Sequence, residues 1–309
     1  MTNETFLFDL PNWSVISISG SDRKSYLHSF CTNDINKLAE DAICEAFIPN
    51  VKGRILGHVF VVNQADELKL ISVPDANETL VPHLTKYLLG VEAEVSDRTS
   101  ETSLIAVIGT NAADVLDLDS NSSFNQTSIL KVDSAECLVS PVGITNQPTY
   151  LVSGDSQSIE DLKQRLFTNN VTEGSAEEFE RMRIEAGFPY VGIDISEANI
   201  AQEAARTKHA ISFTKGCYLG QEPIARLDAM GHTNKELRGF RIESDDVKLG
   251  AKILADEKEV GELSSVVKTN DGQAIGLGII RIKHAEPGSK VAIVTDSGTY
   301  PAEIFWDHL

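Results

Sequence analysis

Short apolar runs separated by turn-forming residues dominate the first third of the chain. Their lengths and spacing predict three strands that follow one another as a meander. These runs are residues 44–48, 55–62 and 68–73. Amphipathic segments at 22–30 and 76–88 predict flanking helices, the second of them interrupted by Pro82. Further strand-like runs lie at 91–95, 104–108 and 129–132. Helices mixed with strands in this way indicate an α+β body.

The strongest helix signal covers residues 176–186. Ser175, followed three residues later by Glu178, is typical of a capping box at a helix start. Gly187 and Pro189 are typical of a helix end. The apolar stripe of this helix comprises Phe179, Met182 and Ala186.

After Gly231 the pattern changes to short strands at close spacing, which predicts a small all-β barrel. These strand-like runs are 237–242, 260–267, 274–281, 290–295 and 300–305. We therefore expect two domains, a two-lobed region at 1–230 and a barrel domain at 231–309. Residues 117–126 are polar and predict an exposed loop.

Composition and charge argue against several classes of function. The chain has 309 residues, of which 41% are hydrophobic, enough for a buried core. Its net charge of -19, with no run rich in Lys and Arg, argues against direct binding of nucleic acid. The start, Met1 to Thr5, lacks an export signal, and no stretch is long and apolar enough to span a membrane. We expect a cytoplasmic protein.

The four cysteines, Cys31, Cys44, Cys137 and Cys217, form no pair or cluster with metal-ligand spacing. We therefore expect no metal site. Three of them are interpreted as small buried apolar residues of a reducing compartment. Cys217 differs because of its surroundings.

Cys217 lies in the most informative stretch of the chain, Lys-Gly-Cys-Tyr-Leu-Gly-Gln-Glu at residues 215–222. Gly216 and Gly220 allow a sharp turn or the close approach of a ligand, and Pro223 suits the first turn of a helix. Backbone N–H groups and the Lys215 ammonium near the thiol favour thiolate. The alternative is a tight strand-to-helix turn around a buried cysteine.

This octapeptide, followed by Arg226, resembles the signature of the YgfZ family, the folate-binding relatives of the glycine-cleavage T-protein. Other segments agree in the same order, so that the resemblance covers nearly the whole chain. They include residues 20–34, 53–56, 183–189, 261–265 and 274–277.

The resemblance implies a three-lobed fold around an opening that holds tetrahydrofolate, with a small C-terminal β-barrel. It also implies a role in supporting iron-sulfur enzymes or their assembly factors, with indirect effects on tRNA modification. Cys217 and Lys215 are then the expected functional pair. The expected folate-binding residues are Glu203, Arg226, Gly216, Tyr218, Gly220, Gln221 and Glu222.

Several of these residues have plainer alternatives. Glu203 matches the position of a pterin-binding Glu in T-proteins, but a surface Glu near a helix start gives the same pattern. Arg226 fits either a ligand carboxylate or a structural salt bridge. Asp34 and Arg54 fit turns of the fold better than ligand contacts.

Three functions remain open. An aminomethyltransferase, which transfers a one-carbon unit from a lipoyl carrier to folate, is disfavoured because T-proteins have Gly-Gly-Ile-x-Asp-Asp where this chain has Gly-Arg-Ile-Leu-Gly-His at 53–58. His58 is a weak candidate for a base in its place. The third function is a non-catalytic interaction protein stabilised by folate. The sequence leaves open whether the chain is an enzyme.

Overall fold

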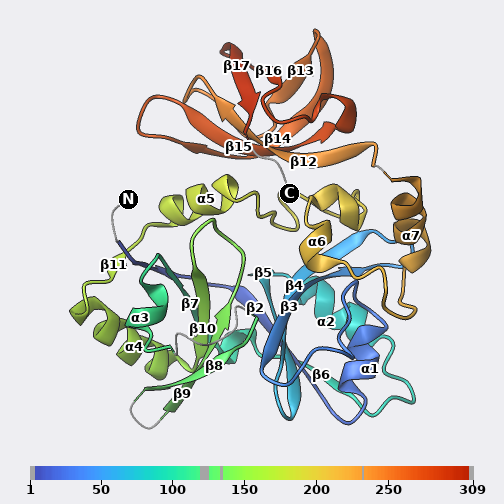
Figure 1. Ribbon diagram of the computed structural model, residues 1–309, viewed down its shortest axis with the longest axis vertical. Coiled ribbons are helices and arrows are strands. Elements are labelled where there is room, and N and C mark those ends of the chain that lie inside the picture. The colour runs from blue at the N-terminus through green and yellow to red at the C-terminus, as the bar shows by residue number, and fades with distance from the viewer. Residues whose placement is uncertain (1–3, 119–124, 133–134, 232, 306–309) are drawn as a thin grey trace. The chain divides into compact units, whose positions relative to one another are not determined.

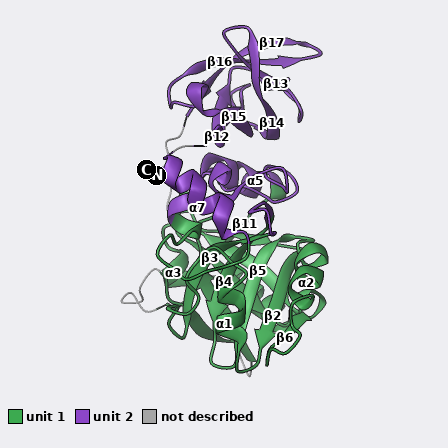
Figure 2. Ribbon diagram, turned by 90° about the vertical axis from the view of Figure 1, so that its right-hand side faces the viewer, with its two compact units in different colours: residues 1–49, 56–176, 209–219 green, residues 50–55, 177–208, 220–309 purple. Residues whose placement is uncertain are grey.

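The computed structural model describes residues 4–118, 125–132, 135–231 and 233–305 (Figure 1). The chain forms two compact units, coloured separately in Figure 2. Unit 1 comprises residues 1–49, 56–176 and 209–219, and unit 2 comprises residues 50–55, 177–208 and 220–309. The two units interleave along the chain, so they do not correspond to the single boundary expected near residue 230. That boundary stays a prediction.

Unit 1 contains a five-stranded sheet in the order β3-β4-β5-β2-β6. Its strands are β2 (Trp13–Ser19), β3 (Ala42–Pro49), β4 (Ile55–Asn63), β5 (Glu67–Pro74) and β6 (Glu94–Asp97). Helices α1 (Arg23–His28) and α2 (Asn77–Thr85) pack against it, and Pro82 is accommodated inside α2. The predicted meander and both predicted helices are therefore confirmed, with shorter helices than the amphipathic pattern suggested.

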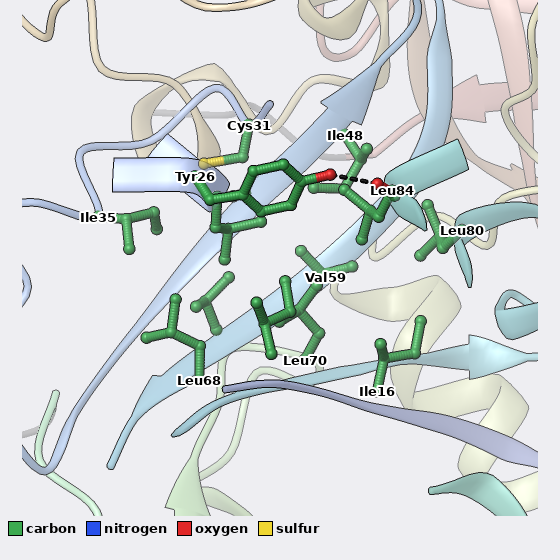
Figure 3. Close-up of a cluster of buried hydrophobic side chains, with 14 of the residues drawn as sticks. Ile16, Tyr26, Cys31, Ile35, Ile48, Val59, Leu68, Leu70, Leu80 and Leu84 are labelled. Carbon is green, nitrogen blue, oxygen red and sulfur yellow. Dashed lines mark hydrogen bonds between the residues drawn. The ribbon is translucent and has the colours of Figure 1, made fainter. Parts of the chain in front are cut away.

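The core of this sheet is a cluster of buried side chains on its helical side (Figure 3). Cys31 is fully buried in the cluster, and the Tyr26 hydroxyl donates to the Leu84 carbonyl oxygen. The loop after α1, which carries Cys31, is thus anchored by apolar packing.

A second sheet of unit 1 has the order β11-β1-β7-β10-β9-β8 and is antiparallel except for the β1–β11 pair. Its strands are β1 (Phe6–Asp9), β7 (Ser103–Ile108), β8 (Ser128–Val132), β9 (Ala135–Pro141), β10 (Thr149–Gly154) and β11 (Thr172–Glu173). The short helices η1 (Thr99–Glu101) and α3 (Ala112–Val115) and the longer α4 (Ser156–Thr168) accompany it. Most of the predicted 117–126 loop lies outside the described residues.

Unit 2 contains helix α5 (Ala176–Glu185), the 3-10 helix η2 (Ala201–Ala204), helix α7 (Gln221–Met230) and a barrel. The start of α6 (Thr207–Ala210) also falls in this unit. Helix α5 confirms the strongest helix prediction, with Phe179 and Met182 buried. Gly187 ends it at φ +67°, a conformation that favours glycine.

The C-terminal barrel is closed, in the order β12-β15-β14-β13-β16-β17. Its strands are β12 (Lys235–Ile242), β13 (Lys252–Ala255), β14 (Lys258–Lys268), β15 (Ala274–Arg281), β16 (Lys290–Thr295) and β17 (Gly298–Ile304), with η3 (Ile282–His284) after β15. The predicted α+β class and small barrel are confirmed. Strand β13 was not predicted, because four residues ending in a tight turn give little periodic signal.

None of the helices in the described part of the chain is long and apolar enough to cross a membrane.

Candidate functional site

The octapeptide of residues 215–222 runs from unit 1 into unit 2, since unit 1 ends at Leu219 and unit 2 resumes at Gly220. Each half is held within its own unit. The Leu219 N–H donates to the Ser29 carbonyl at 2.9 Å, which ties the first half to the end of α1. Gly220 is the N-cap of α7, with φ +76°.

Lys215 is buried, and its ammonium binds one loop of unit 1. Nζ donates to the carbonyl oxygens of His28, Cys31 and Asn33 at 2.6, 2.7 and 2.8 Å. It also lies 3.9 Å from the Cys31 Sγ and 4.7 Å from the centre of the Tyr218 ring. Burial lowers the pKa of Lys215. Its contacts are therefore those of a clamp on residues 28–33, and the expected action on Cys217 stays a prediction.

Cys217 is the one exposed thiol among the described cysteines. Gly216 beside it is exposed, whereas Tyr218 is buried under the Lys215 ammonium. Burial raises the pKa of the Cys31, Cys44 and Cys137 thiols and so keeps them protonated. The buried alternative for Cys217 is thus wrong, and a reagent in solution reaches this thiol most easily.

Gly220 has a packing reason to be glycine. A Cβ at this position would lie 2.2 Å from the Asn50 carbonyl oxygen and 2.9 Å from the Gly53 nitrogen. Gly53 is equally crowded, since its Cβ would meet the Gly220 oxygen at 2.9 Å. Two motifs far apart in sequence therefore meet backbone to backbone within unit 2.

Helix α7 carries the other residues of the motif. Gln221 is half-buried, while Glu222 and Arg226 are exposed on the helix surface. The structure gives these three side chains no hydrogen bond or ion pair with a described residue, so their expected contact with folate stays a prediction, and the salt-bridge alternative for Arg226 gains no support.

A cavity of about 740 Å³ lies within unit 2, a size typical of small-molecule sites. Its lining combines one carboxylate with four cations and some apolar surface. The lining residues are Arg54, Ala198, Glu203, Asn234, Lys235, Arg281, Ile282 and Lys283. This concentration of positive charge is unusual in a chain of net charge -19.

Glu203 is 7% exposed, so it is not the surface residue that the alternative interpretation required. Its Oε2 accepts hydrogen bonds from the Asn199 side chain at 3.0 Å and the Ile200 N–H at 3.3 Å, and lies 3.7 Å from the Lys235 Nζ. Within the described chain, no group donates to Oε1. One carboxylate oxygen is therefore held by the protein, and the other is available at the cavity.

Arg54 lines the cavity and is held there by one backbone pairing and one side-chain hydrogen bond. It pairs with Ile200 as an isolated antiparallel bridge, and its Nη1 donates to the Ala198 carbonyl at 2.7 Å. It supports a turn, the role that the sequence favoured, and it also lines the cavity, while its contact with a ligand stays a prediction.

His58 is unsuited to act as a base. It is 2% exposed, stacks on the Phe47 ring at 4.7 Å between centres, and its Nε2 lies 2.7 Å from a Glu45 carboxylate oxygen. These neighbours make it part of the core of unit 1.

Sequence reasoning missed the cations of β12 and of the β15–η3 junction: Lys235, Arg281 and Lys283. They are isolated charges in the sequence, and the pairing of β12 with β15, which sets Lys235 opposite Arg281 just before η3, brings them together. It also missed His28, which lies against Gly216. No group of His, Cys, Asp and Glu residues with metal-binding geometry occurs in the portion that the structure describes.

Comparison with known proteins matches two family models to the chain. Residues 1–215 match the GCVT N-terminal domain, and residues 235–308 match the glycine cleavage T-protein C-terminal barrel domain. The solved aminomethyltransferase T of the Bartonella henselae glycine cleavage system has the same fold, with a TM-score of 0.86 at 18% identity, covering 98% of this chain and 85% of that one.

Curated relatives include aminomethyltransferases and proteins named for tRNA modification. An aminomethyltransferase of Thermoanaerobacter pseudethanolicus is 26% identical over 94% of this chain and 82% of its own length. A protein named tRNA-modifying protein YgfZ, from Colwellia psychrerythraea, is 26% identical over 95% of this chain and 91% of its own. The YgfZ of Escherichia coli is 24% identical over 96% of this chain. With both family models matched, the chain belongs to the glycine cleavage T-protein family, with similarity to its YgfZ and aminomethyltransferase members.

Proposed function

We propose that this chain is a cytoplasmic tetrahydrofolate-binding accessory protein that supports iron-sulfur enzymes or their assembly factors through the Cys217 thiol. The observation that carries the folate assignment is the available Glu203 Oε1 in a cavity lined by Arg54, Lys235, Arg281 and Lys283.

The chemistry of a reduced folate fits this lining at both ends. The amino-pyrimidine edge of the pterin presents N–H donors, which a carboxylate accepts, and the glutamate tail carries carboxylates, which Arg and Lys bind. Oε2 of Glu203 is held at 3.0 Å by Asn199, so the carboxylate is oriented before a ligand arrives. Such preorganisation reduces the entropy lost on binding.

The accessory role rests on the thiol and on the surface charge. Cys217 is exposed, so a protein partner or a small electrophile can reach it. A net charge of -19 disfavours direct contact with tRNA. The name of the relatives called tRNA-modifying proteins is then consistent with an indirect effect on tRNA modification, through the enzymes that the protein supports.

An aminomethyltransferase is the second candidate, because relatives with that name match nearly the whole chain. The two acidic residues that T-proteins place at the end of the corresponding run are replaced here by Gly57 and His58. With His58 bound to Glu45 in the core, no carboxylate or base of this segment is free to replace them.

Titration calorimetry with tetrahydrofolate tests the assignment. We expect Glu203→Gln to weaken binding about 10- to 150-fold, the worth of a hydrogen bond to a charged group at about 1.5–3 kcal/mol. Glu259→Gln is the matched control, since Glu259 also pairs with a lysine, Lys252 at 2.6 Å, but is exposed and outside the cavity. Equal affinities for the wild type and Glu203→Gln would contradict the site.

A further inference from the structure

Two basic residues of the barrel lie directly opposite each other, Lys235 at the start of β12 and Arg281 at the end of β15. Opposite residues of an antiparallel pair point to the same face, with their Cβ atoms about 4.5–5.5 Å apart, and like charges placed in this way are destabilising. Lys283 follows in η3. Three cations therefore gather at one end of the barrel, on the wall of the cavity, and lower the stability of the strand pair.

Arg281 and Lys283 form no ion pair with any residue that the structure describes. Neither β15 nor η3 contains an acidic residue, and the one acidic residue of β12, Glu236, pairs with Arg238 at 2.8 Å. The chain as a whole has 46 acidic and 27 basic residues. In such a chain, two cations that face a cavity without a carboxylate partner favour an anionic ligand.

The charges of the cavity follow an order from buried to exposed. Glu203 is 7% exposed. The Lys235 side chain is 39% exposed, and its Nζ lies 3.7 Å from the Glu203 carboxylate. Arg281 and Lys283 are exposed. A ligand that donates hydrogen bonds to Glu203 therefore extends its far end past Lys235 toward the two exposed cations.

We propose that Arg281 and Lys283 select a folate whose tail has several γ-linked glutamates, by binding the carboxylates beyond the first glutamate. This inference rests on the proposed folate site and names the form of folate that the site prefers. A tail of one glutamate carries two carboxylates, and each further glutamate adds one. The four cations of the cavity thus match the four carboxylates of a triglutamate tail, whereas a monoglutamate leaves two cations without partners.

The selectivity is expected to be modest and sensitive to salt, because the two outer cations are exposed. Exposed ion pairs contribute little individually, so two additional pairs should tighten binding about 3- to 20-fold. Salt screens exposed charges, and in ~0.5 M salt the advantage should fall to about twofold or less. A pentaglutamate tail meets no further cation among the described residues that line the cavity, so it should bind within about twofold of the triglutamate.

Titration calorimetry on the full chain tests the proposal with the mono-, tri- and pentaglutamate forms of tetrahydrofolate. The double variant Arg281→Gln, Lys283→Gln should bind the triglutamate within about twofold of the monoglutamate. The matched control is Arg241→Gln combined with Lys268→Gln. It removes the same charge from exposed positions of the barrel outside the cavity, and it should keep the wild-type ratio.

The double variant is expected to fold. Arg281→Gln removes a like-charge pair from the β12–β15 ladder, so thermal denaturation should give a Tm at or above that of the wild type. Lys283→Gln alone leaves that ladder unchanged and serves if Arg281→Gln is unstable. It should remove about half of the triglutamate advantage on a logarithmic scale.

Three results would overturn the selection by Arg281 and Lys283 alone. One is equal affinity of the wild type for the mono- and triglutamate. Another is a triglutamate preference that survives in the double variant. The third is a preference that the control also loses, since the total charge of the barrel then explains it. If the wild type binds none of the three folates, the proposed folate site at Glu203 is itself refuted, and the tail selection with it.

Discussion

Replacing Lys215 by Met removes the clamp on the loop of residues 28–33 and nearly preserves side-chain length. Three backbone carbonyls, those of His28, Cys31 and Asn33, then lose a charged donor. A buried group left without its partner costs about 1–3 kcal/mol, and Met offsets part of this because no ammonium has to be desolvated. We expect a loss of about 2–4 kcal/mol in the free energy of unfolding.

Thermal and urea denaturation measure this loss. For a unit of this size, it corresponds to a decrease of about 4–16 °C in Tm. Lys37→Met is the matched control, because Lys37 is a lysine of the same loop region that pairs with Asp34 at 3.2 Å but has a side chain 76% exposed. An exposed pair of this kind contributes about 0–1 kcal/mol.

The same variant separates two roles of Lys215. A clamp predicts a large loss of stability in Lys215→Met, whereas direct activation of the thiol predicts slower Cys217 alkylation with little change in Tm. If Lys215→Met unfolds within about 1 kcal/mol of the wild type, the clamp interpretation is refuted.

Further predictions concern the turn, the core and the chemistry. In thermal denaturation, Gly220→Ala should destabilise the protein by more than Gly231→Ala does. Both glycines have φ near +77° at the ends of α7, but only at Gly220 would a Cβ clash with the Asn50 oxygen. Equal losses in the two variants would contradict this crowding at Gly220. Tyr26→Phe should lower stability by about 1 kcal/mol at pH 7. Burial, and to a smaller extent Tyr87, raises the pKa of Tyr26 in the folded protein to about 12. The contribution of Tyr26 to stability is therefore complete below the unfolded pKa of about 10 and is lost as pH rises through about 12. An alkaline unfolding transition that is the same in the wild type and in Tyr26→Phe would count against this. The purified protein should not release ammonia from an aminomethyl-lipoyl carrier at ~1 per second or more, and such turnover would restore the transferase. Cys217→Ala should fail to restore an iron-sulfur enzyme in cells lacking the native protein while Cys137→Ala restores it, and rescue by both would leave the thiol without this role.

Local patterns along the chain predicted most of the fold. The short apolar run at 55–62 and the capping and stop signals around 176–187 correspond to β4 and α5, because both signals depend on neighbours in sequence. Strands such as β9 and β13 were missed, since their short apolar runs are stabilised by partners in the sheet and not by their own periodicity.

For the site, the sequence by itself determined which residues have unusual chemistry: a cysteine bracketed by glycines, a carboxylate at Glu203 and an excess of negative charge. Tertiary structure decided their surroundings. It placed the Lys215 ammonium on backbone carbonyls of a loop that lies up to 187 positions earlier in the sequence. It also placed His28 beside Gly216. Contacts at such separations leave no periodic or spacing signal in one sequence, because they form when buried surfaces of distant segments pack together.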